Sequence, residues 1–222
     1  MLRKVIILIC VLMGLSCETH STDGGISNDI PAGKIQIAME RSVPIYAGMG
    51  PVAHGSGMIV APNRIVTCLH VAEHAKNDIM IEYEGERRSA RLLAQFPPAD
   101  LALLEAEVED FGVIEVVGSG DLRIGQSVFL IGSAYGLTRS FMRGYIGHLD
   151  RTGSDVRFPG IPFIQTDRIS YPGNSGAGVF TASGAFIGIN RASFGFAPGS
   201  GIGLTVPARI VVLFLREQGI AL

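Results

Sequence analysis

Short apolar runs, each bounded by glycine, proline, asparagine or aspartate, follow one another along most of this chain. Runs of this kind that are rich in β-branched and aromatic side chains are typical of β-strands. They predict strands at residues 57–60, 64–68, 79–83, 88–93, 101–105, 113–117, 127–131, 140–148, 163–166, 178–180, 186–190 and 203–206. The 29 glycines among 222 residues also favour an all-β fold over a helical one.

Two segments have a helical pattern instead. A short helical turn is expected at residues 71–75, and a C-terminal helix with an apolar stripe is expected at residues 208–218. The segment GSGDLRI at residues 118–124 is typical of a surface linker. This linker divides the strands into two sets of about six, as a protein of two β-barrels would need. The first barrel would then take residues 35–117, and the second, with the C-terminal helix, residues 118–222.

The N-terminus has the three parts of a secretory signal peptide. Two basic residues precede an apolar run at residues 5–13, and a small-x-small end follows it. The apolar run is too short to form a comfortable transmembrane helix. We therefore expect residues 1–16 to be removed, and the protein to be exported to the cell envelope (the periplasm or a membrane-anchored form) or secreted.

Cys17 directly follows this segment, in an arrangement that resembles a bacterial lipoprotein signal, where a lipid is attached to the cysteine after cleavage. Residues 17–34 are polar and rich in glycine, serine and aspartate, which predicts a flexible tether. A lipidated Cys17 would make this tether a membrane anchor. The other two cysteines cannot form a disulfide framework, because Cys10 leaves with the signal and Cys68 is expected to be a buried small hydrophobe.

Three polar residues in separate segments have the chemistry of nucleophilic acyl transfer, which needs a hydroxyl, a base, an orienting acid and backbone N–H donors for the oxyanion. Ser175 lies in the segment YPGNSG, whose glycines can adopt the positive φ angles that direct backbone amides to one point. Gly173 and Ser175 are therefore the candidate oxyanion donors. His70 ends a predicted strand, and Asp100 opens another among apolar residues, where a buried carboxylate needs hydrogen-bond donors.

These segments, in this order, resemble the trypsin-like serine proteases, most closely the bacterial HtrA branch. The similar segments share their order and spacing with that family: GSGMIV at 55–60, TCLHV at 67–71, DLALL at 100–104, FIQTD at 163–167, PGNSG at 172–176, FIGIN at 186–190 and IGLTVP at 202–207. The resemblance covers about residues 50–210. It implies two perpendicular six-stranded antiparallel β-barrels with the site between them, and it implies no cofactor.

The family's catalytic roles carry over to matching positions. The resemblance implies that Ser175 is the nucleophile, that His70 is the general acid and base, that Asp100 orients His70, and that the amides of Gly173 and Ser175 form the oxyanion hole. It further implies hydrolysis of peptide bonds through an acyl-enzyme, on exposed or unfolded segments of protein or peptide substrates. Ala177 departs from the family, which usually has a second glycine there.

Two other properties of the HtrA branch do not carry over directly. The chain ends soon after its last predicted helix, so the PDZ domain of typical HtrA proteins is expected to be absent, and the oligomeric state stays open. Ile169 falls where the family places the base of its first specificity pocket, which predicts cleavage after small or medium apolar residues. Alternatively, Arg168 or Arg191 favours acidic substrates, as in the related glutamyl endopeptidases.

Other protein classes fit this sequence less well. The net charge of −2 argues against a nucleic-acid-binding protein. An α/β-hydrolase needs a histidine after its nucleophile, and no histidine follows Ser175. Residues 70–74 spell H-x-x-E-H, the inverted zinc-protease motif, so a zinc metalloprotease using His70 and His74 is an alternative, although that motif needs a longer helix. A non-proteolytic binding or chaperone-like module is the other alternative.

Overall fold

The computed structural model describes residues 30–222 apart from residue 77, residues 110–111, residue 119 and residues 195–200. The predicted signal peptide, Cys17 and most of the predicted tether at residues 17–34 lie outside the described residues. The last residues of that tether, 32–34, belong to a helix. Within the described ranges, no helix has the length and apolar character needed to span a bilayer.

The first half of the chain forms a closed antiparallel β-barrel. Its strands are β1 (Ser42–Ala47), β2 (Gly55–Ala61), β3 (Arg64–Cys68), β4 (Ile79–Tyr83), β5 (Glu86–Phe96) and β6 (Leu101–Glu105). They close in the order β1-β2-β3-β6-β5-β4. Side chains alternate between buried and partly buried along β4, whereas β2 is buried along almost its whole length. That difference matches the apolar sequence of β2 and the alternating sequence of β4.

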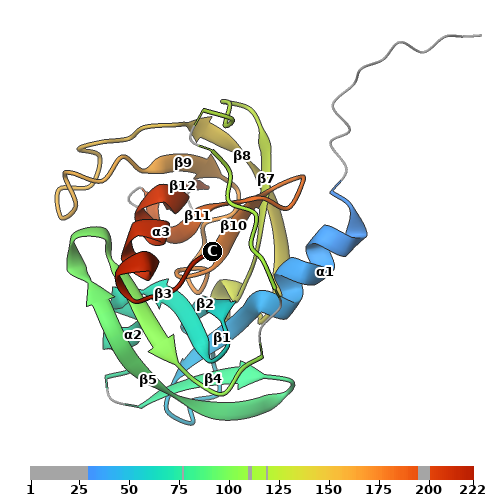
Figure 1. Cartoon of the computed structure of the whole chain (residues 1–222), viewed down its shortest axis with the longest axis vertical. Helices are drawn as coiled ribbons and strands as arrows, with labels where there is room; N and C mark the ends of the chain where they lie inside the picture. Colours follow the sequence, from blue (N-terminus) through green and yellow to red (C-terminus); the bar gives the residue numbers. More distant parts are fainter. Residues whose placement is uncertain (1–29, 77, 110–111, 119, 195–200) are drawn as a thin grey trace, which may run out of the picture.

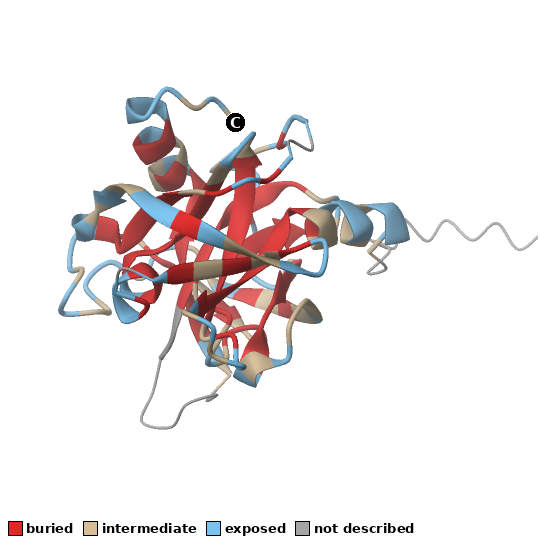
Figure 2. Ribbon diagram, turned by 90° about the horizontal axis from the view of Figure 1, so that it is seen from below, coloured by how far each residue is buried: buried red, intermediate tan, exposed pale blue. Residues whose placement is uncertain are grey.

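The second half forms another closed antiparallel barrel, beside the first in Figure 1. Its strands are β7 (Ser127–Gly132), β8 (Ser140–His148), β9 (Ile164–Asp167), β10 (Gly178–Thr181), β11 (Phe186–Phe194) and β12 (Ile202–Pro207). They close in the order β10-β11-β12-β9-β8-β7. Buried residues fill both barrels, as Figure 2 shows, and the predicted all-β fold of two six-stranded barrels is confirmed.

One predicted strand was wrong, and one strand was missed. Residues 113–117 connect the barrels without forming a strand: Val113 is 93% exposed, and one isolated bridge joins Val116 to Phe186. The strand β1 was not predicted, because Pro44 interrupts its pattern. The structure accommodates Pro44 because pairing of β1 with β4 begins only at the next residue, Ile45. The two errors offset each other, so the predicted number of strands per barrel holds.

Helices pack against strands of both barrels. The helix α1 (Ala32–Arg41) was not predicted, because Pro31 at its N-cap provides no capping side chain. The helix α2 (Leu69–His74) forms the turn expected after β3, and α3 (Ala208–Glu217) is the predicted C-terminal helix. Two 3-10 turns, η1 (Pro97–Ala99) and η2 (Ala134–Gly136), precede β6 and β8. Phe214 of α3 stacks on Phe96 of the first barrel, so α3 ties its own barrel to the first.

Candidate active site

His70 and Asp100 meet at the end of the first barrel that faces the second. The antiparallel pairing of β3 with β6 brings Cys68 opposite Leu101, so the residues that follow β3 lie beside the residue that precedes β6. The Leu69 N–H donates to the Asp100 carbonyl oxygen at 2.9 Å, which holds the start of α2 against this turn. The catalytic candidates His70 and Asp100, 30 residues apart in the chain, are therefore in direct contact.

The backbone of Asp100 is shaped by the turn before it. Pro97 and Pro98 open the 3-10 turn η1, and Asp100 ends it in the left-handed conformation, with φ 57° and ψ 42°. Aspartate tolerates this conformation better than most side chains because its short polar side chain can bond locally. The Asp100 N–H donates to the Pro97 carbonyl at 3.1 Å, which closes the turn. The turn directs the carboxylate back toward His70.

Both oxygens of the Asp100 carboxylate accept hydrogen bonds from His70. The His70 backbone N–H donates to Oδ1 at 2.9 Å, and His70 Nδ1 lies 2.7 Å from Oδ2. Burial of Asp100 would raise the pKa of its carboxyl, but the hydrogen bonds and charge of His70, with a further hydrogen bond from Arg191, lower that pKa below its ordinary value. A charged Asp100 fixes the proton of His70 on Nδ1, which leaves Nε2 free to act as a base.

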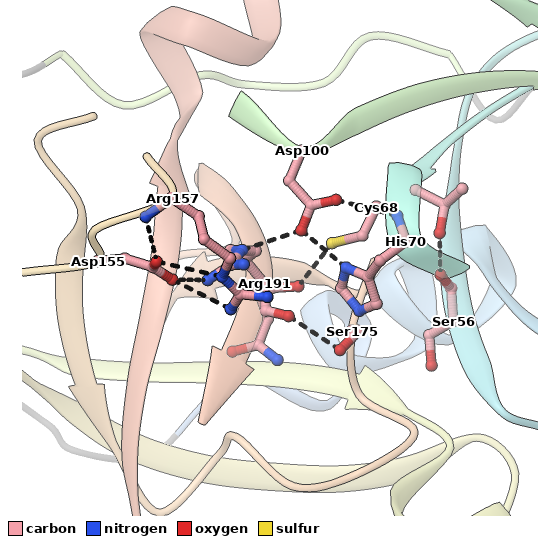
Figure 3. A network of polar contacts seen from close by, with 10 residues as sticks. Ser56, Cys68, His70, Asp100, Asp155, Arg157, Ser175 and Arg191 are labelled. Carbon is pink, nitrogen blue, oxygen red and sulfur yellow. Dashed lines mark hydrogen bonds and ion pairs between the residues drawn. The ribbon is translucent and has the colours of Figure 1, made fainter. Parts of the chain in front are cut away.

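Ser175 lies beside His70 but its hydroxyl is directed elsewhere. Ser175 Oγ donates to the backbone carbonyl of Arg191 at 2.9 Å, as Figure 3 shows. In the described part of the chain, no hydrogen bond joins Ser175 to His70. Catalytic hydrogen bonds are often long or misaligned before a substrate binds. To donate to His70, the Ser175 hydroxyl would first have to turn away from the Arg191 carbonyl.

The loop before Ser175 is held in a shape that only glycine permits at one position. Gly173 has φ +95°, and a Cβ there would lie 2.1 Å from the Ser133 carbonyl oxygen. Ser56 Oγ donates to the Gly173 carbonyl at 2.8 Å and accepts from the Ser133 N–H at 3.0 Å, so the first barrel anchors this loop of the second. Across the described residues, the N–H groups of Gly173 and Ser175 donate to no protein acceptor, and the oxyanion hole that they were expected to form stays a prediction.

The predicted pocket residue lies in the interior. Ile169 is fully buried in the hydrophobic cluster of the second barrel, so its side chain is not accessible to a substrate in this conformation. Its carbonyl accepts a hydrogen bond from the side chain of Asn174 at 2.8 Å. Asn174, which no sequence motif marked as functional, is itself buried next to Ser175. The role of Ile169 as a pocket base stays a prediction.

The two arginines considered for acidic substrates are placed differently. Arg191 is only 3% exposed, and its guanidinium bonds Asp100 and Asp155 inside the protein, so the expectation that it contacts an acidic substrate was wrong. A free cation could attract a substrate carboxylate, but this one is already paired with two carboxylates. Arg168 is exposed, with its Nε 3.6 Å from Asp167 Oδ2, and its contact with an acidic substrate stays a prediction.

The structure does not bring together the residues that the zinc alternative would use as metal ligands. The ring of His74 packs against His54, with ring centroids 4.7 Å apart, while His70 faces Asp100. Among the described residues, the side chains grouped closely enough to hold a metal ion are Cys68, His70 and Asp100, without Glu73 or His74. Burial and the nearby charge of Asp100 raise the pKa of the Cys68 thiol well above its ordinary value, so Cys68 is a poor metal ligand.

The family model that matches this chain describes a peptidase domain, and curated relatives that match it are named as proteases. The sequence profile of the trypsin-like peptidase domain family matches residues 55–189. A "Probable periplasmic serine endoprotease DegP-like" of Halomonas elongata is 34% identical over 161 residues, which are 71% of this chain and 33% of that protein. A "Probable serine protease do-like" of Buchnera aphidicola is 34% identical over 164 residues, or 72% of this chain and 34% of that protein.

Solved structures with a similar fold include HtrA-type proteases. The structure "HtrA-type protease AlgW with tripeptide" superposes on this chain with a TM-score of 0.73 and 27% sequence identity. The aligned region covers 85% of this chain and 64% of the AlgW chain. The chain spans about one third of the length of the curated relatives it matches.

Proposed function

This chain belongs to the trypsin-like peptidase family, and from that premise we propose that it is a serine endopeptidase that cleaves peptide bonds through an acyl-enzyme. The observation that carries the proposal is the contact of His70 with both oxygens of a buried Asp100, next to Ser175. An imidazole held by a carboxylate beside a serine hydroxyl is the arrangement that activates a weak nucleophile.

Each step of the reaction has a group to perform it. Ser175 Oγ attacks the carbonyl carbon of the scissile bond, and His70 Nε2 takes the hydroxyl proton. The Gly173 and Ser175 N–H groups bind the oxyanion, while Asp100 stabilises the imidazolium through Nδ1. His70 then gives its proton to the leaving amine as the C–N bond breaks. A water molecule, deprotonated by His70, hydrolyses the acyl-enzyme and restores Ser175.

The proposed substrates are proteins or peptides, because the relatives are named serine endoproteases, and the resemblance to the HtrA branch implies that exposed or unfolded segments are cleaved. We expect the protein to degrade a reduced and alkylated protein chain but to leave the same protein intact in its native disulfide-bonded form. A metal chelator should have no effect, since the proposed reaction uses side chains and backbone donors.

Cleavage after small or medium apolar residues is expected, and mass spectrometry of the fragments measures it. Cleavage after lysine or arginine would contradict this specificity.

We also propose that the protein is exported and that Cys17 anchors it to a membrane. The relatives are named periplasmic proteins, and the predicted signal peptide and cysteine have the order of a lipoprotein signal. The mature protein isolated from membranes should then have a mass that includes a lipid on Cys17. A mature mass without any acyl addition would disprove the anchor and leave export as a separate question.

A further inference from the structure

Arg191 lies in the interior of the site and contacts two carboxylates from different parts of the chain. Its Nε donates to Asp100 Oδ2 at 2.9 Å, and its NH1 forms an ion pair with Asp155. Its guanidinium also lies over the ring of Phe158, 4.3 Å from the centroid. Asp155 and Phe158 belong to the loop of residues 149–163, between β8 and β9, and Figure 3 shows this network reaching His70 through Asp100.

The cost of burying this arginine indicates that its partners are specific. A guanidinium cannot lose its charge inside a protein, and a charge removed from water is tolerated only when it is well paired. The chain meets this requirement with one carboxylate on each side of Arg191. The planar guanidinium bonds in fixed directions, so the two pairings also fix where the Asp100 carboxylate lies.

The hydrogen bond from Arg191 does not displace His70. A carboxylate has about four acceptor positions. The Asp100 carboxylate accepts three hydrogen bonds from described residues, because Oδ1 takes the His70 N–H and Oδ2 takes both His70 Nδ1 and Arg191 Nε. Rotation of the carboxylate would break all three bonds. The backbone carbonyl of Arg191 also accepts from Ser175 Oγ, so this one residue contacts two members of the proposed triad.

We propose that Arg191 is a positioning residue of the active site: anchored by Asp155, it holds Asp100 in the orientation in which the carboxylate accepts the hydrogen bond from His70. This inference rests on the proposed peptidase function, since it concerns the same site. It assigns the loop of residues 149–163 a direct connection to the triad, through Asp155.

The charge of Arg191 also affects the pH range of activity. The charged and titratable groups around it are Cys68 on β3, His70 on α2, Asp100 before β6, and Asp155 with Arg157 in the loop. Removing the guanidinium leaves two carboxylates without their shared cation. The site then carries more uncompensated negative charge, which favours uptake of a proton, and the acid limb of the activity profile is expected to move to higher pH.

The test measures how fast a fluorophosphonate labels Ser175 between pH 5 and pH 9. In Arg191→Met the second-order labelling rate should fall by about 100-fold, since a small displacement of a catalytic group has an effect of this size. The acid limb should rise by about one pH unit. Arg191→Lys keeps the charge but not the two-sided bonding, so the limb should stay in place while the rate falls. Arg157→Met is the matched control, because Arg157 also contacts Asp155 but is exposed and does not contact Asp100, and it should behave as wild type.

The outcomes separate this inference from the function on which it rests. If the wild type is not labelled, or if Ser175→Ala is labelled equally, the peptidase function fails. If the wild type is labelled and a cooperatively folded Arg191→Met has the same rate and the same acid limb, the positioning role is wrong although the function stands. If Arg191→Met does not fold, Asp155→Asn replaces it, because this variant removes only the anchor. A smaller loss of rate in Asp155→Asn supports the inference, and a wild-type rate and limb overturn it.

Discussion

Ser175→Ala is expected to lower the rate of peptide-bond hydrolysis by about a million-fold. The variant loses the atom that forms the acyl-enzyme, while the backbone N–H donors and substrate-binding surface remain. Among the residues that the structure describes, the one side-chain hydrogen bond lost runs from Ser175 Oγ to the Arg191 carbonyl, so the fold should be preserved. The measurement is the rate of fragment release from an unfolded protein, with the thermal unfolding temperature recorded for both proteins.

Ser183→Ala is the matched control for this experiment. Ser183 is exposed in the turn between β10 and β11. Its hydroxyl forms a hydrogen bond with the Thr181 hydroxyl and with no residue of the proposed site among those described. Its activity should equal that of the wild type. Activity that survives Ser175→Ala and disappears with a chelator would restore the zinc alternative at His70 and His74. Absence of turnover in the wild type as well would favour the binding or chaperone-like module.

Asp100→Asn is expected to lower the turnover number by about 10⁴-fold. An asparagine has nearly the same shape, but its amide nitrogen can donate to Nδ1 and so favours the tautomer in which Nε2 holds the proton. His70 can then no longer accept the proton of Ser175. Steady-state kinetics on a chromogenic peptide measures this effect, and the Michaelis constant should change much less than the turnover number, because Asp100 is buried beneath the site.

The same variant should also lose stability, and the loss depends on pH. Asp100 is the partner of a buried arginine, so its neutralisation should lower the free energy of unfolding by about 3 kcal/mol at pH 7. The pKa of Asp100 is lowered in the folded protein, so its charge stabilises the fold above the ordinary carboxyl pKa of about 3.9. This contribution disappears as the pH falls through the lower, folded value.

The difference in thermal unfolding temperature between wild type and Asp100→Asn should therefore be full at neutral pH and shrink below about pH 4. Asp121→Asn is the control, because Asp121 is exposed in the linker between the barrels and should show a small difference at every pH. A difference that grows on acidification would show that Asp100 does not stabilise the fold as a carboxylate.

Local sequence patterns determined most of the β-structure. The strands β3, β4, β6 and β8 have the predicted bounds. Their apolar and polar side chains follow the pattern of a strand, which can be recognised in the sequence alone. Where a strand depends on its partners, the local pattern failed. Pro44 obscured β1, whose place is decided by pairing with β2 and β4. Residues 113–117 pair with Phe186 through one isolated bridge and do not extend this contact into a ladder.

The sequence also pointed to the residues of the candidate site, because motifs in three separate segments resemble one family. It could not show how these residues meet. The contact of His70 with Asp100 follows from the pairing of β3 with β6, and the loop of Ser175 takes its shape from Ser56 and Ser133, which precede it in the chain by 119 and 42 residues by their numbers.

Arg191 shows most clearly what only the tertiary structure decided. In the sequence it is one charged residue after an apolar strand, and surface exposure is the ordinary expectation for such a residue. Its burial depends on Asp100, 91 residues away, and on Asp155, 36 residues away. A buried cation is stable only where the fold brings opposite charges to it, and local sequence does not contain that information.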